Sequence, residues 1–329
     1  MAIELIAEVG SVHDGSFGNA CKLIEAAAAC GVDGVKFQTH IAEAESLASA
    51  PSPAYFDGEP RIDYFRRTAF SEEQWRRLKA VCAANKVAFL SSPFSLEAVD
   101  FLEAVGVERY KIPSGEVTNL PLLERVAATG KPVLLSSGMN DWAELDSAVE
   151  ALRPGGPITV MQCTSAYPCP PERVGLNVLA EMAARYGLPV GFSDHSDGLT
   201  AAIAAAALGA SVIEKHFTFS RLMYGSDAAN ATEPADFARL AAALKALSSM
   251  LASPVDKDDL APYAEMKRVF EKSVVTARAL AAGTQLTEAD LAFKKPGDGI
   301  SAARFRELVG RTVKHDLAAD HPISPADFS

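Results

Sequence analysis

The sequence predicts an α/β fold, a (β/α)8 TIM barrel, followed by a small C-terminal domain. Two observations predict the barrel. Short apolar runs rich in β-branched residues alternate with longer stretches of helical period, and this alternation repeats eight times before the pattern changes. In addition, polar residues follow these apolar runs at the same end, which is where the active sites of such barrels lie.

The eight strand candidates are short and continuously apolar, as expected for parallel strands that are buried on both faces. They are Leu5–Val9, Gly34–Phe37, Val87–Ser91, Arg109–Ile112, Pro132–Ser136, Ile158–Gln162, Pro189–Phe192 and Val212–Lys215. The helix candidates are Gly18–Cys30, Glu72–Asn85, Leu96–Val105, Pro121–Thr129, Asp141–Leu152, Gly175–Tyr186, Leu199–Leu208 and Pro234–Leu251. An open doubly wound sheet is the alternative, but no glycine-rich dinucleotide turn follows the first strand.

Two segments depart from the alternation. His40–Phe70 is a long insertion after the second strand, rich in proline and aromatic residues, and it fits a cover over the barrel mouth and a surface loop equally well. The tail from Lys272 has short strand-like runs and turns in place of long amphipathic helices. We therefore expect a catalytic domain at 1–255, a linker at 256–271 and a small domain at 272–329.

Charge and composition exclude several function classes. The 329-residue chain has a net charge of −11, which argues against nucleic acid or an anionic membrane as its main partner. No apolar run reaches the roughly 18 residues of a membrane span, and no export signal is visible. The five cysteines include no CxxC pair, so we expect free thiols in a reducing cytoplasm.

Reactive side chains collect at the carboxyl ends of all eight predicted strands. A single lysine or serine there is usually solvated or a helix cap, but agreement among eight strands indicates a site. The segments are Glu8, Lys36–Thr39, Ser91–Phe94, Lys111–Glu116, Ser136–Met139, Gln162–Pro168, Ser193–His195 and Glu214–Phe217.

Two lysines, Lys36 and Lys111, and several hydroxyl groups are expected to face one cavity. Lysine serves as a point charge for phosphate, and serine and threonine hydroxyls add hydrogen-bond donors. The pattern therefore predicts a phosphorylated anion as ligand. A nucleoside triphosphate is not favoured, because the chain has no Walker-type loop.

Two histidines suggest a metal site. His195 and His216 lie 21 residues apart, one strand–helix repeat, so they should end neighbouring strands about 4.8 Å apart. Two imidazoles could then share manganese, iron, cobalt or zinc, with oxygen ligands from water, substrate and Glu8 or Glu116. Two hydrogen-bonded structural histidines would show the same spacing, so both interpretations remain open.

Nine short motifs are distributed along nearly the whole chain: Ile6–Gly10, Val35–Thr39, Ser91–Phe94, Tyr110–Glu116, Ser136–Met139, Cys163–Pro168, Gly191–Ser196, Ile213–Thr218 and Pro296–Ser301. Together they resemble the sialic acid synthase family, which includes N-acetylneuraminate, legionaminate and pseudaminate synthases. The tail resembles the antifreeze-like domain, a β-clip or SAF fold, that ends these enzymes.

The resemblance implies a metal-dependent condensation of phosphoenolpyruvate with an open-chain N-acetylated amino-sugar aldehyde and water, which gives a nonulosonic acid and phosphate. The metal would be held by residues matching His195 and His216 and would polarise the aldehyde. Manganese is expected, with magnesium or cobalt as alternatives. Glu116 matches a carboxylate near the metal and the reacting carbons.

The resemblance also implies where both substrates bind. The sugar would contact residues matching Glu8, Tyr167 and Asp227. The residues that match phosphoenolpyruvate-binding positions are Lys36, Ser92, Lys111, Ser114, Ser136, Ser165 and Ser193.

Finally, the resemblance implies a homodimer in which the C-terminal domain of each chain covers the barrel of its partner. An arginine of that domain contacts the acyl group of the sugar in the family, and Lys295 occupies the matching position here. Lysine lacks the planar fork of arginine. The sugar, N-acetylmannosamine or a 2,4-diacetamido-trideoxyhexose, is therefore left open.

Two other function classes remain as alternatives. A Schiff-base lyase or aldolase would use Lys36 or Lys111 as nucleophile and would need no metal. A non-catalytic sugar-binding protein would use the tail for recognition. The histidine pair argues against the first, and the full set of mouth residues argues against the second.

Overall fold

The computed structural model describes residues 3–52, 59–225 and 227–328, and the chain divides into two compact units, Met1–Ser253 and Pro254–Ser329. The N-terminal unit is a closed barrel in which eight parallel strands follow one another in sequence order. The predicted (β/α)8 barrel is confirmed, and the open doubly wound sheet is excluded. Each strand agrees with its predicted range to within two residues at each end. The strands are β1 Glu4–Gly10, β2 Gly34–Thr39, β3 Ala88–Pro93, β4 Tyr110–Ile112, β5 Val133–Ser136, β6 Ile158–Cys163, β7 Val190–Asp194 and β8 Val212–His216.

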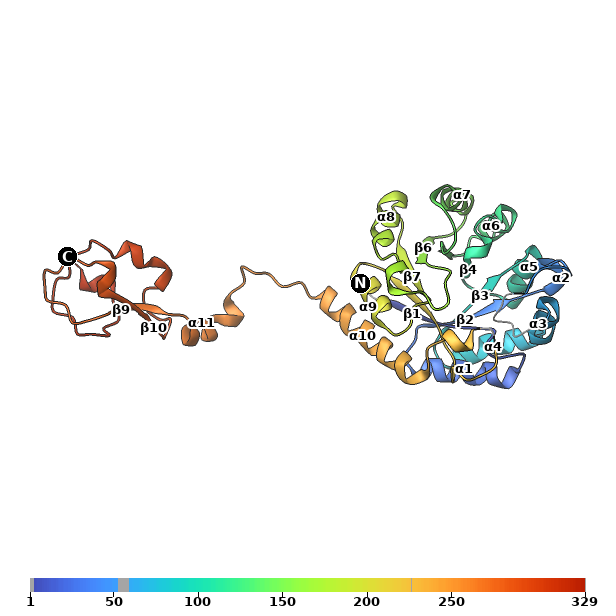
Figure 1. Cartoon of the computed structure of the whole chain (residues 1–329), viewed down its shortest axis with the longest axis horizontal. Helices are drawn as coiled ribbons and strands as arrows, with labels where there is room; N and C mark the ends of the chain where they lie inside the picture. Colours follow the sequence, from blue (N-terminus) through green and yellow to red (C-terminus); the bar gives the residue numbers. More distant parts are fainter. Residues whose placement is uncertain (1–2, 53–58, 226, 329) are drawn as a thin grey trace. The chain divides into compact units, whose positions relative to one another are not determined.

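The helices of the N-terminal unit surround these strands, as Figure 1 shows. They are α1 Phe17–Ala29, α2 Ala42–Glu45, α3 Arg61–Thr68, α4 Glu72–Ala84, α5 Leu96–Val105, α6 Leu120–Ala127, α7 Trp142–Leu152, α8 Asn177–Tyr186, α9 Thr200–Ala207 and α10 Pro234–Ala252. Only α2 and α3 were not expected, and both lie in the insertion after β2. None of the helices in the described ranges is long and apolar enough to cross a bilayer.

Local sequence signals set several helix ends. Ser71 and Gln74 form a reciprocal capping box at the start of α4, and Asp141 and Glu144 form another at the start of α7. Helix α5 ends at Gly106, whose φ of 81° lies in the left-handed region that glycine adopts without steric cost. These signals place each helix so that its apolar face meets the barrel wall.

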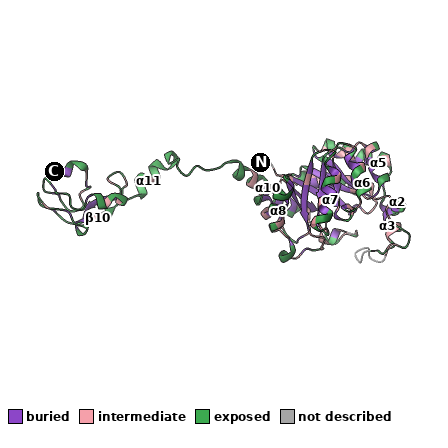
Figure 2. Cartoon of the chain, turned by 90° about the horizontal axis from the view of Figure 1, so that it is seen from above, coloured by how far each residue is buried: buried purple, intermediate pink, exposed green. Residues whose placement is uncertain are grey.

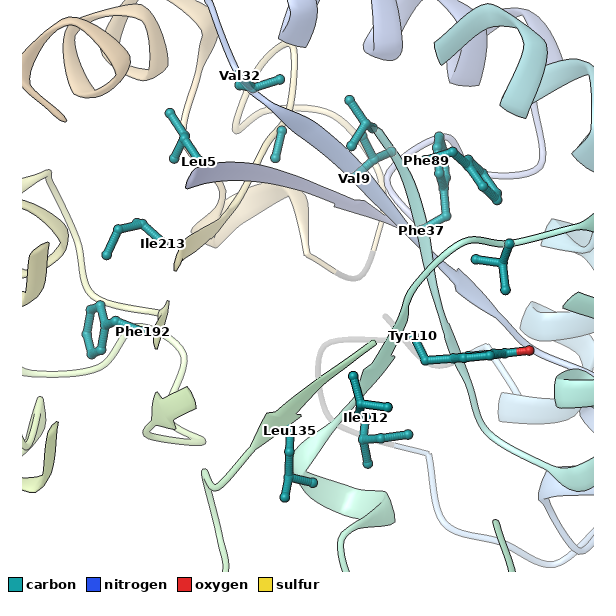
Figure 3. Packing of buried hydrophobic residues seen from close by; sticks show 14 of the residues in the cluster. Leu5, Val9, Val32, Phe37, Phe89, Tyr110, Ile112, Leu135, Phe192 and Ile213 are labelled. Atoms are coloured by element: carbon teal, nitrogen blue, oxygen red, sulfur yellow. The ribbon is translucent and has the colours of Figure 1, made fainter. Parts of the chain in front are cut away.

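The strands bury both faces, and Figure 2 shows the barrel wall as the most buried part of the N-terminal unit. Outward-pointing side chains pack under the helices in one large apolar cluster, which includes Leu5, Phe37, Tyr110, Phe192 and Ile213 (Figure 3). The alternate side chains point into the barrel. At its bottom they form a smaller apolar cluster of Ile6, Leu90, Leu134, Met161 and Val212.

The C-terminal unit has its own small core. Strands β9 Ser273–Thr276 and β10 Leu291–Lys294 pair antiparallel, and short 3-10 turns and isolated bridges complete the unit. Its buried apolar residues include Val274, Leu286, Val313 and Ile323. Before these strands, α11 spans Ala264–Phe270 and lies inside the range predicted as a linker.

Candidate active site

The central feature of the barrel interior is a buried layer of two lysines and two glutamates above the apolar floor. Lys36 Nζ lies 2.8 Å from Glu8 Oε2 and 3.7 Å from Glu214 Oε1, and Lys111 Nζ lies 2.7 Å from Glu214 Oε1. All four side chains are at most 5% exposed. Ser193 Oγ donates to Glu214 Oε1 at 3.1 Å, which adds a hydrogen bond to the same carboxylate. Buried carboxylates therefore compensate the two ammonium groups at the base of the barrel interior.

The two carboxylates of this ionic layer titrate differently. Burial acts to raise the pKa of Glu214, but the ammonium groups of Lys111 and Lys36 outweigh it and hold that pKa at about 2. Burial raises the pKa of Glu8 above its ordinary value, although Lys36 opposes the rise. Glu214 is therefore the fixed counter-charge of the lysines, and Glu8 is the carboxyl group that can hold or release a proton.

Above the ionic layer, the mouth of the barrel encloses a cavity of about 350 Å³. One part of its wall carries hydroxyl groups from the ends of β5 and β7 and from the segments that follow β4 and β6. Ser114, Ser136, Ser165 and Ser193 line the cavity together with Lys111. The predicted anion-binding lysines and hydroxyls thus lie together. Ser92 is buried beneath them and accepts a hydrogen bond from Lys36 Nζ at 3.4 Å.

A glycine is required between two of these hydroxyl groups. The backbone N–H of Gly138 donates to Ser114 Oγ at 2.8 Å. A Cβ atom at Gly138 would lie 2.5 Å from Ser165 Oγ and 2.6 Å from Ser114 Oγ, which is too close for any side chain. The absence of a side chain at this position keeps the hydroxyl groups in place.

The two histidines end neighbouring strands, and their ring centroids are 5.4 Å apart. His195 Nδ1 lies 2.9 Å from the carbonyl oxygen of Thr164. Because a carbonyl only accepts, Nδ1 carries the proton in the neutral ring, and Nε2 keeps its lone pair. Burial lowers the pKa of His216, which keeps that ring neutral at pH 7, and its Nδ1 is buried without a hydrogen-bond partner.

These features fit a metal ion, since a neutral imidazole with a free lone pair is a good ligand for divalent ions. Within the described ranges, no three or more His, Cys, Asp or Glu residues are arranged to hold a metal. The two imidazoles are therefore the protein ligands that the site offers, and further ligands would come from water or substrate.

A second buried ion pair holds the two histidine-bearing strands together. Lys215 Nζ lies 2.7 Å from Asp194 Oδ2 and donates to the carbonyl oxygen of Ser196 at 2.8 Å. Lys215 alternates with Glu214 and His216 along β8, so it points away from the cavity that they line. Because the paired residues directly precede His216 and His195, the pair fixes how the two imidazoles lie relative to each other.

The cavity wall also holds the predicted sugar-binding side chains. Glu8, Tyr167 and Asp227 all line the cavity, and the Tyr167 ring lies 4.2 Å from that of His195. Gly10 approaches this group closely: it has a φ of 54°, and a Cβ there would lie 2.9 Å from Asp227 Oδ2. A side chain at position 10 would therefore clash with the carboxylate of Asp227.

Two predicted site residues of the N-terminal unit, Ser92 and Glu116, do not line this cavity. Glu116 does not line it; its carboxylate instead accepts from Asn119 Nδ2 at 2.8 Å, and burial raises its pKa. Glu116 is the last residue of a 3-10 turn, Ser114–Glu116, whose first residue, Ser114, lines the cavity. Lys295 belongs to the C-terminal unit, where its ammonium group lies 4.9 Å from the ring centroid of Phe270.

The structure also brings to the cavity residues to which the sequence assigned no individual role. Glu214 and Gln38 belong to the strand-end segments named above and alternate with His216 and Lys36 on the inner face. Gln38 Nε2 donates to Glu8 Oε1 at 2.8 Å. Phe94, Met139 and Cys163 lie in other strand-end segments that the sequence indicated. No local pattern indicates the residues of the insertion, which are His40, Arg61 and Phe65.

Comparison with known proteins agrees with the fold. Residues 23–256 match the model of the NeuB family, and residues 271–329 match the SAF domain. The chain is 34% identical over 330 residues to the N,N'-diacetyllegionaminic acid synthase of Campylobacter jejuni, covering 97% of this chain and 98% of that protein. It is 32% identical over 327 residues to the human N-acetylneuraminate-9-phosphate synthase, covering 97% and 90%. It is 30% identical over 333 residues to the pseudaminic acid synthase of Helicobacter pylori, covering 99% and 97%.

Solved structures show the same architecture. The N-acetylneuraminic acid synthetase of Leptospira borgpetersenii, crystallised with citrate, is 27% identical and superposes with a TM-score of 0.73 over 81% of this chain and 91% of that one. A spore coat polysaccharide biosynthesis protein of Bacillus subtilis is 28% identical, with a TM-score of 0.67 over 100% and 95%. These comparisons confirm the resemblance and the fold that the sequence motifs predict.

The ionic layer leads to a prediction about stability. Glu214→Gln should lower the free energy of unfolding by about 3–5 kcal/mol at pH 7, because Lys111 then stays buried without its carboxylate. The pKa of Glu214 is lowered by folding, from an ordinary 4.5 to about 2. Its contribution is therefore complete above pH 4.5 and is lost as the pH falls toward 2. Urea denaturation should show the difference between the two proteins shrinking over that range.

Glu25→Gln is the matched control, since Glu25 pairs with Lys22 on the surface and both side chains are largely exposed. Such pairs contribute about 0–1 kcal/mol. If Glu214→Gln were no more destabilising than this control, the lysines would not depend on Glu214.

Proposed function

Because the chain belongs to the NeuB family and ends in a SAF domain, we propose that it condenses phosphoenolpyruvate with an N-acylated amino-sugar aldehyde and water. The products would be a nonulosonic acid, that is a sialic-type sugar, and phosphate. The named relatives are synthases of sialic-type acids, so the chain is an enzyme of this class. The observation that carries the proposal is one cavity that joins the lysine–serine wall to the histidine pair.

We assign phosphoenolpyruvate to the lysine–serine wall. Its phosphate and carboxylate need donors and positive charge, and this wall offers two ammonium groups and several hydroxyls. The proposed contacts are Lys36, Ser92, Lys111, Ser114, Ser136, Ser165 and Ser193, of which all but Ser92 line the cavity. Ser92 would act by holding Lys36.

We assign the aldehyde end of the sugar to the histidine pair. His195 and His216 would hold a divalent ion, with manganese proposed and magnesium or cobalt as alternatives. When bound, the ion would supply Lewis-acid polarisation of the aldehyde oxygen. Tyr167, Asp227 and Glu8 line the same cavity and would hold sugar hydroxyl groups.

Different residues of the chain would have different roles in the reaction. C3 of phosphoenolpyruvate attacks the aldehyde carbon, water adds at C2, and phosphate leaves by cleavage of its bond to C2. Glu8, whose pKa burial raises, would hold the proton that the new hydroxyl group takes up. Glu214 stays ionised and keeps both lysines in place. Glu116 would not contact the substrates directly. It would act through the 3-10 turn Ser114–Glu116, which carries Ser114.

The Schiff-base alternative disagrees with the state of the lysines. A nucleophilic lysine must lose its proton, which requires a lowered pKa. Burial acts against the charged form of Lys36, but Glu214 and Glu8 outweigh it and raise its pKa. Lys111 is likewise paired with a carboxylate. The non-catalytic alternative disagrees with the comparisons, because the chain matches a protein named as a synthase over nearly the whole length of both.

We further propose that the chain forms a homodimer in which the SAF domain covers the barrel of the partner and Lys295 contacts its sugar. Support comes from the C-terminal unit, which exposes large apolar side chains that would be expected to meet a partner. They are Val255, Leu260, Tyr263, Met266, Val269 and Phe270. We place the reaction in the cytoplasm, because all five cysteines are free thiols.

Phosphate release tests the proposed reaction. Manganese-loaded protein should release inorganic phosphate when mixed with phosphoenolpyruvate and one of three sugars: N-acetylmannosamine or the diacetamido-trideoxyhexoses that lead to legionaminate and pseudaminate. A chelator should abolish the release. Folded, metal-replete protein that releases no phosphate with any of them would refute the proposal.

The histidine assignment has its own test. His195→Ala and His216→Ala should each reduce turnover at least about 100-fold, because each removes one of two protein ligands of the ion. Circular dichroism should show an unchanged fold, and metal content should fall. His315→Ala in the C-terminal unit is the control. A variant of either site histidine with normal turnover would exclude the metal assignment.

Truncation tests the role of the SAF domain. A chain ending at Glu271 should show a sugar KM raised about 10-fold or more, because polar contacts from the SAF domain of the partner are lost. The KM of phosphoenolpyruvate should change little. An unchanged sugar KM would contradict the covering role.

A further inference from the structure

The insertion after β2 carries a cationic side chain to the mouth of the barrel. Arg61, the first residue of α3, lines the cavity, and its side chain is 31% exposed. The two other cationic side chains in this wall, Lys36 and Lys111, lie deeper and are paired with carboxylates. Among the described cavity residues, Arg61 is thus the cation placed at the entrance.

The position of the guanidinium group is fixed by aromatic residues. Its Cζ lies 5.3 Å from the centroid of the Phe65 ring. That ring stacks on His40 at 3.7 Å, and Phe94 stacks on the other face of His40 at 4.1 Å. His40 is held in turn by hydrogen bonds to Glu45 at 2.8 Å and Gln38 at 3.2 Å.

Among the residues that the structure describes, the guanidinium group of Arg61 has few hydrogen-bond partners. The nearest carboxylate oxygen among them, Glu45 Oε1, is 3.7 Å from Nη2, which is too far for a hydrogen bond. Nε is buried, and none of these residues forms a hydrogen bond with it. An arginine whose donors are left free by these neighbours is suited to bind an oxygen atom of a ligand.

Charge and surroundings indicate what kind of oxygen this is. Glu45 lies close enough to offset the charge of Arg61, and Glu116 interacts electrostatically with both. A phosphate dianion would be repelled by these carboxylates, whereas a neutral carbonyl would not. Phe65, Phe94 and Met139 line the same cavity and offer apolar contact. The N-acyl group of an amino sugar combines these two features, a neutral carbonyl and a small apolar group.

We propose that Arg61, supported by Phe65 and His40, is a specificity residue that binds the carbonyl oxygen of an N-acyl group on the amino sugar. This inference rests on the proposed function and deepens it, because it places an acyl-binding subsite within the barrel's own chain.

The test compares the accepted sugar with its deacylated counterparts across three variants. The substrates are the sugar that the wild-type enzyme accepts and its counterparts in which each acetamido group in turn is replaced by hydroxyl. The variants are Arg61→Gln, Arg61→Lys and the control Arg66→Gln, which alters an exposed arginine of the same helix that does not line the cavity. The readout is phosphate release, analysed as kcat/KM for each sugar and KM for phosphoenolpyruvate.

Arg61→Gln should lower kcat/KM about 10-fold or more for the acylated sugar. It should change kcat/KM little for the counterpart that lacks the contacted acyl group, and it should leave the KM of phosphoenolpyruvate unchanged. Arg61→Lys, which keeps charge but loses the fork, should lie between. Equal losses for acylated and hydroxyl sugars, or no loss, would overturn the inference. A wild-type enzyme that releases no phosphate with any sugar would instead refute the proposed function, and the inference with it.

Discussion

The structure depends on charge compensation in the middle of the barrel. Two lysines and two glutamates are buried between an apolar floor and an open cavity, and none of the four would be tolerated there alone. Glu214 is central to this layer because, among the described residues, it is the carboxylate that pairs with both Lys36 and Lys111. The layer holds two ammonium groups in place at the base of the cavity. A phosphorylated anion can bind to them there without a large rearrangement of water.

The same compensation separates the roles of groups that are chemically alike. Glu214 is held ionised by two lysines, whereas Glu8 has one lysine and the charge of Glu214 beside it, so its pKa moves in the opposite direction. Such divergence between neighbouring carboxyl groups is typical of acid–base assignments in active sites. Burial lowers the pKa of His216, the carbonyl group of Thr164 orients the His195 ring, and the Lys215–Asp194 pair links the strand ends that carry both residues. Glu214 likewise positions the two lysines.

Much of the site could be predicted because a parallel barrel leaves few choices. Once eight strands are recognised, their carboxyl ends meet at one mouth, and most of the predicted residues line the cavity there. Glu116 illustrates the limit: one residue beyond Ser114–Gly115, a 3-10 turn directs its side chain away from the cavity toward Asn119. Arg61 is the opposite case, since nothing in its local sequence distinguishes it from Arg66 or Arg67 on the same short helix.

By itself, the sequence determined the order of strands and helices and the barrel, since these follow from local periodicity and short-range spacing. The SAF tail and the roles of the motif residues came from the resemblance to the sialic acid synthase family. The tertiary structure decided which side chains share one charge-compensated layer, which carboxyl group keeps its proton, and how the insertion reaches the mouth. These depend on distances between residues far apart in the chain, such as Lys111 and Glu214 or Gln38 and Glu8, and on the burial that strengthens their interaction. No local pattern encodes such distances, because they arise only when the barrel closes.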